Sequence, residues 1–280
     1  MTTTLEVVVE ASATEAASLA WTGERVLFSR PSDNELWQFD PKSGTVSLFR
    51  RFTGGVTGVT ADSSGRVYGC QTLSRRIVTY ENDGSTSVLA THLDGRLHNF
   101  PRYATVDRGG RVWFADPRLG LRPPGPVVFP ALEHSSVLRL VRGDDGAWTL
   151  TRMTFDTHQP TVVAVANDDS ALYVVDDGAD GRQELRAYPI VQGVLDAASV
   201  LATFDRVDDR APVTGMAVGP RGQVLVAGRG GVFAVNGDGH LELLAELREG
   251  ATDVAFGEPG NAAFYVTTAD GALLRGEAAV

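Results

Sequence analysis

A short polar stretch in the middle of the chain holds the side chains best suited to chemistry. It contains His98, Asn99, Arg102 and Tyr103. Histidine, tyrosine and asparagine can move protons or donate hydrogen bonds near neutral pH, and the planar guanidinium of arginine suits a carboxylate, an enolate or an oxyanion. A second histidine, His158, stands at the corresponding place before a later strand. These residue types predict acid-base chemistry on an anionic or carbonyl-bearing molecule, provided that the fold brings them together.

The polar stretch belongs to a pattern that recurs along the chain. Each copy reads as an apolar strand, a turn rich in Asp, Gly and Asn, and a second apolar strand. The six copies occupy residues 18–29, 58–70, 98–117, 163–177, 215–228 and 253–268. All-strand units that repeat every roughly 40 to 60 residues are typical of propeller blades. The sequence therefore predicts an all-β fold, a six-bladed β-propeller.

Second hairpins follow most copies and should form the outer strands of the blades. They lie at residues 34–50, 75–89, 136–151, 183–203 and 231–244. The sixth copy is followed only by residues 271–277, one strand short, while the apolar segment at residues 5–10 has no partner. We expect this N-terminal strand to complete the last blade, because closure removes the open edge of the ring.

Composition is typical of one soluble domain that spans residues 1–280. The chain has 43% hydrophobic and 21% charged residues and a net charge of −10. No basic cluster suits a nucleic acid or an anionic membrane, and no apolar run approaches the roughly 20 residues of a membrane span. The single cysteine, Cys70, fits a reducing compartment and an inert buried thiol, and the start of the chain lacks a signal peptide. We expect a cytoplasmic protein; its oligomeric state stays open.

The longest irregular segment runs from Arg118 to His134 and contains four prolines. It leaves the end of a strand in the central repeat, where propeller loops can cover the mouth of the channel. Long loops stiffened by proline are often lids or binding walls. The segment is either such a lid, with His134 near the site, or a plain surface excursion.

The motifs of the central repeat resemble the gluconolactonase family, also called the senescence marker protein or regucalcin-like family. The resemblance rests on residues 99–103, 105–107, 110–111, 113–114 and 116–120, and extends to residues 75–76, 228–232 and 252–257. It implies a six-bladed propeller that hydrolyses small lactones with one divalent cation, often calcium, on the channel axis.

The implied metal ligands are missing from this chain. Where the family supplies Glu, Asn, Asn and Asp, this sequence has Ala17, Arg102, Thr161 and Thr214. Calcium needs six or more oxygen ligands, whereas alanine offers none and arginine brings a positive charge into the ligand shell. We therefore expect no metal at the usual place and no other cofactor. Glu15, two residues upstream of the expected Glu, could restore a shifted metal site.

Arg102 offers a replacement for the cation, since its fixed charge could hold a substrate anion or oxyanion. Alternatives remain for each residue: Arg102 could pair with Asp116 or Glu15, Tyr103 could be a packed core ring, and the histidines could be ordinary rim residues. The candidate catalytic residues are Arg102, Tyr103, His98 and His158. The candidate substrate-binding residues are Asn99, Asp116, Thr161, Thr214 and His134.

Other catalytic templates are missing from the sequence, which contains no Gly-x-Ser-x-Gly, His-Glu-x-x-His or phosphate-loop motif. Two classes of function remain. The first is a metal-independent enzyme that opens or closes a lactone, isomerises, cyclises or decarboxylates a small molecule, with bacterial specialised metabolism as its expected setting. The second is a propeller that binds a small molecule or serves as a scaffold without catalysis, and a metal lactonase with a shifted site is a further alternative.

Overall fold

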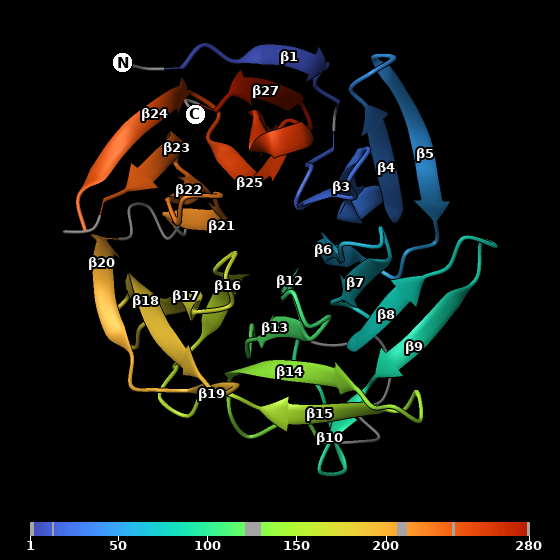
Figure 1. The fold of residues 1–280 in the computed structure, drawn as a ribbon, viewed down its shortest axis with the longest axis vertical. Helices are drawn as coiled ribbons and strands as arrows, with labels where there is room; N and C mark the ends of the chain where they lie inside the picture. The colour runs from blue at the N-terminus through green and yellow to red at the C-terminus, as the bar shows by residue number, and fades with distance from the viewer. Residues whose placement is uncertain (1–2, 13, 121–129, 206–211, 237–238, 279–280) are drawn as a thin grey trace.

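Six antiparallel sheets surround a central axis in the computed structural model, which describes residues 3–12, 14–120, 130–205, 212–236 and 239–278 (Figure 1). The predicted six-bladed propeller is confirmed. Each blade runs from an inner strand beside the axis to an outer strand at the rim. The Pro-rich part of the predicted lid, residues 121–129, lies outside the described residues. No helix in the described ranges is long and apolar enough to cross a membrane.

The first three blades use consecutive strands. Blade 1 consists of β2 (Leu19–Trp21), β3 (Val26–Arg30), β4 (Glu35–Asp40) and β5 (Thr45–Arg51). Blade 2 consists of β6 (Val56–Ala61), β7 (Val67–Gln71), β8 (Arg76–Tyr80) and β9 (Thr86–Ala90). Blade 3 consists of β12 (Tyr103–Val106), β13 (Val112–Asp116), β14 (Ser136–Arg142) and β15 (Trp148–Arg152). A small hairpin of β10 (His92–Leu93) and β11 (Arg96–Leu97) precedes blade 3.

The remaining blades follow the same plan. Blade 4 consists of β16 (Pro160–Val165), β17 (Ala171–Asp177), β18 (Arg182–Val191) and β20 (Ser199–Asp205), with the short β19 (Val194–Leu195) paired to β18. Blade 5 consists of β21 (Val213–Val218), β22 (Val224–Gly228), β23 (Gly230–Val235) and β24 (Leu241–Leu247). Blade 6 holds β25 (Ala251–Gly257), β26 (Ala263–Thr268) and β27 (Leu273–Glu277). The two short 3-10 helices are η1 (Pro31–Asp33) and η2 (Pro259–Asn261).

The N-terminal strand β1 (Glu6–Val9) is the outer strand of blade 6. It pairs antiparallel with β27, with Glu6 opposite Arg275 and Val7 opposite Leu274. The predicted closure by the N-terminal strand is therefore confirmed. Figure 1 shows the consequence: the first and last strands of the chain lie side by side at the rim.

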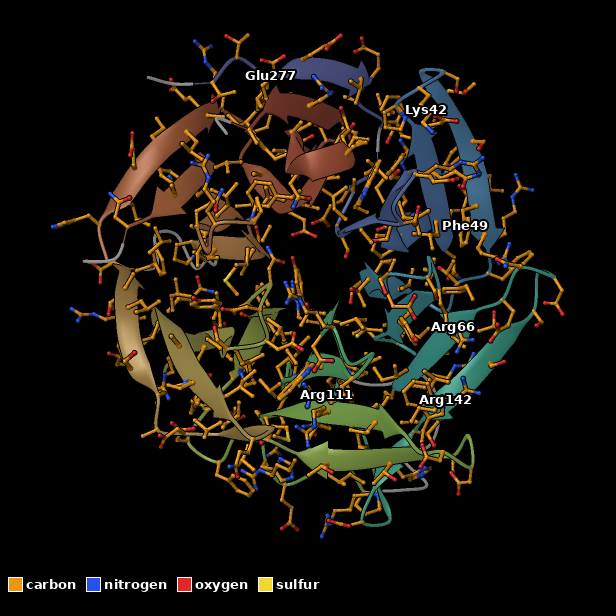
Figure 2. All side chains as sticks on the ribbon, in the orientation of Figure 1. Lys42, Phe49, Arg66, Arg111, Arg142 and Glu277 are labelled. Carbon is orange, nitrogen blue, oxygen red and sulfur yellow. The ribbon has the colours of Figure 1, made fainter. Side chains whose placement is uncertain are left out.

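The apolar core lies between the blades rather than in one central mass. Trp113 of blade 3, for example, packs in a buried cluster with Val163 of blade 4 and Met216 of blade 5. Four further clusters join the other neighbouring blades. Charged residues such as Lys42 and Arg142 lie at the outer edge of the ring (Figure 2). Because neighbouring blades share their apolar surfaces, the ring holds its inner strands in fixed positions.

Bulges interrupt four inner strands near their starts. The pairing of inner with second strand skips one residue in each, and the skipped residues are Thr57, Thr161, Thr214 and Thr252. A bulged residue has no partner across the ladder, so its side chain can be aimed differently from its neighbours. Repeat alignment places Arg102 and Ala17 at the same position in blades 3 and 1, just before β12 and β2. We call these six residues the axial ring.

Candidate active site

A cavity of about 360 Å³ opens at one end of the channel. It is lined by five of the six axial-ring residues, Ala17, Thr57, Arg102, Thr214 and Thr252, and by Glu15, Pro31, Ser32, Gly55, Thr72, Leu73, Tyr103 and Leu119. Every blade except blade 4 contributes a lining residue, because Thr161 is buried and does not line the cavity. The volume is that of a site for one small molecule.

Three threonine hydroxyls of the axial ring are committed to neighbouring blades. Thr57 donates to the carbonyl oxygen of Arg102 (3.1 Å), and Thr214 donates to that of Ala251 (3.0 Å). Thr252 donates to the carbonyl oxygen of Ala16. Each bond joins one blade to the next in the ring. Since a hydroxyl has one proton, these oxygens face the cavity only as hydrogen-bond acceptors.

Arg102 is the cation of the cavity. Its backbone N–H donates to the carbonyl oxygen of Ala115 (3.1 Å), which fixes it at the start of β12. Among the residues that the structure describes, its guanidinium makes no hydrogen bond and no ion pair. Burial lowers the pKa of Arg102, and the negative charges of Asp177 and Glu15 oppose that shift. An arginine stays protonated at neutral pH, so the cavity offers a charged, uncommitted donor.

A buried hydrogen-bond network closes the channel beneath the cavity. The Tyr103 hydroxyl donates to Asp253 Oδ1 (2.5 Å) and accepts from the backbone N–H of Met216 (3.2 Å). Asp253 also accepts from the backbone N–H groups of Leu19 (2.7 Å) and Val254 (2.8 Å). Burial raises the pKa of Asp253 to about 7 and that of the Tyr103 phenol well above its usual value. We call these groups the waist.

The waist separates the cavity from a second depression at the other end of the channel. That depression, of about 240 Å³, is lined by the far ends of the inner strands, and Tyr103 borders both spaces. The Tyr103 ring forms part of the floor of the cavity, while the phenol oxygen is engaged with Asp253.

The two histidines expected at the site lie elsewhere. His98 is fully buried in blade 3, where its ring stands edge-on to Phe114 (5.4 Å between centroids) and its Nδ1 is 3.7 Å from Asp116 Oδ2. His158 is exposed, and its Nδ1 lies 2.9 Å from the carbonyl oxygen of Asp177. Neither lines the cavity. The expected convergence of both histidines with Arg102 does not occur, because the His98 ring packs against Phe114 and the His158 ring lies against the carbonyl oxygen of Asp177.

The other expected substrate-binding residues stabilise the loop before β12. Asp116 Oδ2 accepts from the backbone N–H of Asn99 (2.9 Å), and the Asn99 side chain donates to the carbonyl oxygens of Asp116 (3.1 Å) and His134 (2.8 Å). His134 Nδ1 lies 2.9 Å from Ser136 Oγ. None of the three lines the cavity. Asp116 is thus no ion-pair partner for Arg102, and of the substrate-binding set only Thr214 reaches the cavity.

Sequence reasoning missed two parts of the site. The first part, Thr252 and the neighbouring carboxylate of Asp253, could have been predicted from the repeats. Thr252 stands at the same repeat position as Thr57 and Thr214. The second part, the apolar mouth, could not have been predicted, since Pro31, Leu73 and Leu119 come from loops of different blades. Loops carry no repeat period that would predict their meeting.

The donor set of the cavity does not fit a divalent cation. Among the described lining residues Glu15 is the only carboxylate, the threonine hydroxyls are weak ligands, and Arg102 places a positive charge in the same space. Within the described ranges, no group of three or more His, Cys, Asp or Glu side chains could hold a metal ion. A calcium site needs several carboxylate or carbonyl oxygens, and this cavity does not offer them.

Comparison with known proteins assigns the family. The family model described as SMP-30/Gluconolactonase/LRE-like region matches residues 14–270. The chain belongs to this family. A gluconolactonase of Zymomonas mobilis is 23% identical over 264 residues, which is 86% of this chain and 72% of the relative. The predicted resemblance to the gluconolactonase family is therefore confirmed.

Two solved structures have the same fold. A gluconolactonase from Xanthomonas campestris matches with a TM-score of 0.84 and 26% identity, covering 98% of this chain and 89% of the other. A calcium-binding protein, regucalcin, from Agrobacterium tumefaciens matches with a TM-score of 0.77 and 15% identity, covering 98% and 94%. The second likeness concerns the fold alone.

Proposed function

We propose that this member of the SMP-30/gluconolactonase family is a metal-independent enzyme that opens the ring of a small lactone. Membership of the family and the gluconolactonase relatives support a lactonase-type enzyme. The observation that carries the metal-independent chemistry is the guanidinium of Arg102, charged and without a protein partner among the described residues, in a cavity closed by the waist.

The reaction needs one electrophilic group and one base. The Arg102 guanidinium donates hydrogen bonds to the lactone carbonyl oxygen and stabilises the negative charge that develops there when water attacks. Glu15, the one carboxylate that lines the cavity in the described part of the chain, takes a proton from the attacking water. The tetrahedral intermediate collapses, the ring C–O bond breaks, and the alkoxide receives the proton from Glu15. The new carboxylic acid group gives its proton to solvent water, and the product carboxylate leaves by the mouth of the cavity.

The remaining polar groups surround the lactone and the attacking water. The axial-ring threonines offer acceptor oxygens, and Tyr103 supplies the floor. Its phenol stays protonated, because burial and the Asp253 carboxylate raise its pKa. His98 and His158 have no part in the proposed chemistry.

Arg102 is the residue that tests this proposal. Arg102→Ala should lower kcat/KM for an aromatic lactone such as dihydrocoumarin by about 30-fold to 1000-fold, the equivalent of roughly 2 to 4 kcal/mol. Arg102→Lys should rescue little, because a point charge cannot reproduce the guanidinium fork. The melting temperature should stay close to wild type, since the guanidinium has no described protein partner to lose.

The control is Arg118→Ala, which removes an exposed arginine that does not line the cavity and should leave kcat/KM unchanged. All assays are run with EDTA and again with added calcium, which should change neither rate nor melting temperature. Unchanged turnover in folded Arg102→Ala, or activity that requires calcium, would refute the proposal. Tight ligand binding without turnover in the wild type would instead favour a binding propeller.

A further inference from the structure

The mouth of the cavity is apolar, in contrast to its floor. Pro31, Leu73 and Leu119 line it from blade 1, blade 2 and the segment after β13. Leu73 is 55% exposed although it is a large apolar side chain. It lies over Gly55, where an added Cβ would be 2.9 Å from Leu73 Cδ1. The glycine therefore leaves room for this leucine at the edge of the cavity.

The floor offers few hydrogen-bond donors. Thr57, Thr214 and Thr252 have given their hydroxyl protons to blade carbonyl oxygens. Thr72 likewise donates to the carbonyl oxygen of Pro101 (2.7 Å). Among the described lining side chains, Arg102 is the one charged donor, and Ser32 is exposed at the mouth.

These two features disfavour a polyol. A polyhydroxylated lactone presents hydroxyl groups along its whole body, and each needs both donors and acceptors when it leaves water. Polar groups buried without a partner cost roughly 1 to 3 kcal/mol each, and the apolar mouth would leave several of them unpaired. By contrast, one carbonyl or carboxylate can accept hydrogen bonds from Arg102, and an apolar body against the mouth brings no further polar groups that need partners.

We infer that the cavity takes a lactone, or the hydroxy acid formed from it, that carries an alkyl or aryl body, and discriminates against sugar-type polyols. The head group lies at Arg102 among the threonine oxygens, and the apolar body contacts Leu73, Leu119 and Pro31. The lactone chemistry in this inference rests on the proposed function, whereas the binding preference rests on the cavity alone.

Binding of simple carboxylates tests the preference without catalysis. Butanoate, hexanoate, octanoate and gluconate are titrated calorimetrically into the full-length protein. We expect affinity to rise with chain length, by about threefold to fourfold for each buried CH₂, and octanoate to bind at least tenfold more tightly than gluconate. Arg102→Ala should weaken all four ligands.

Substitution at the mouth locates the apolar contact. Leu73→Ser and Leu119→Ser should each weaken octanoate binding by about tenfold and leave butanoate binding nearly unchanged. The matched control is Val88→Ser, which replaces a 49% exposed apolar side chain on the outer strand of blade 2 and should have no effect. Gluconate binding as tight as that of octanoate would overturn the inference. The inference would also be wrong if affinity still rose with chain length to the same extent in both leucine variants.

Turnover distinguishes the inference from the proposed function. The same variants are assayed with γ-lactones that carry no side chain or an alkyl chain, and with glucono-1,5-lactone. If carboxylates bind as expected but no lactone is opened, the substrate class stands and the proposed reaction fails. If lactones are opened without preference for the alkyl series, the reaction stands and the substrate class fails.

Discussion

Single residues decide what the axial ring can bind. Threonine at four of its positions and alanine at a fifth offer no charge, so Arg102 is the charged residue of the axial ring. Sequence reasoning found Arg102 because its type contrasts with the ligand expected there. The prediction that His98 lies at the site was wrong, although His98 is only four residues before Arg102. Closeness along the chain does not fix the direction of a side chain, and the His98 ring points into the blade against Phe114.

Asp253 gives the stability of the protein a pH dependence. Burial raises the pKa of this carboxyl from about 3.8 in the unfolded chain to about 7 in the folded protein. The folded protein therefore binds this proton more tightly than the unfolded chain does. The resulting contribution to the free energy of unfolding is fully present below about pH 4 and is lost as pH rises through about 7. At roughly 1.36 kcal/mol per pKa unit, the contribution is at most about 4 kcal/mol.

We expect Asp253→Asn to remove this pH dependence. The free energy of unfolding of both proteins is measured in urea between pH 4 and pH 8. As pH rises, the wild type should lose stability relative to the variant. The variant should be less stable at low pH, because its amide N–H₂ faces backbone donors such as the Leu19 N–H. A difference that stays constant over this range would contradict the assignment.

Elements position the site through bulges and through close backbone contacts that only glycine permits. A Cβ on Gly58, which follows Thr57 in β6, would lie 2.4 Å from the carbonyl oxygen of Arg102. Gly58→Ala must therefore push the start of β12 away. We expect a loss of about 1 to 3 kcal/mol in unfolding free energy together with weaker ligand binding, because Arg102 moves with its carbonyl.

The control for this effect is Gly109→Ala in the turn of blade 3, where an added Cβ comes no closer than 3.3 Å to a side-chain atom. It should be nearly neutral in unfolding free energy and in binding. A Gly58→Ala protein with wild-type stability would show that blades 2 and 3 can separate without cost. The bulges themselves were beyond sequence reasoning, because a skipped residue changes the pairing and leaves the apolar pattern intact.

At the scale of the whole molecule, the ring depends on its closure. Leu5 packs in the cluster between blades 5 and 6, and Val8 and Val9 pack in the cluster between blades 6 and 1. Deletion of Met1 to Glu10 removes these contacts and leaves β27 as an open edge. We expect a large fall in melting temperature and self-association, measured by thermal unfolding and size-exclusion chromatography. A synthetic peptide of residues 1–12, added to the truncated protein, should restore its stability. A truncated protein that stays monomeric with an unchanged melting temperature would contradict the role of β1.

The fold was more predictable than the site. The number of blades was predicted from the six repeats, and the closure was predicted from the strand missing in the last copy. Both follow from the pattern of apolar residues along the chain. A site on the axis collects residues that are 38 to 59 positions apart from one blade to the next, such as Thr57 and Arg102. Their equivalence could be read from the repeats, but the mouth, formed by loops without a period, could not.

The axial ring also separates the parts of this protein that evolution can change freely from those that it cannot. Thr57, Thr214 and Thr252 join neighbouring blades through their hydroxyls, so their replacement loosens the scaffold. Arg102 and Ala17 make no such side-chain bond in the described part of the chain. New side chains at these two positions would alter the chemistry of the cavity while the ring that holds them persists. Substitutions at these two positions should therefore change what the cavity binds with little loss in the free energy of unfolding.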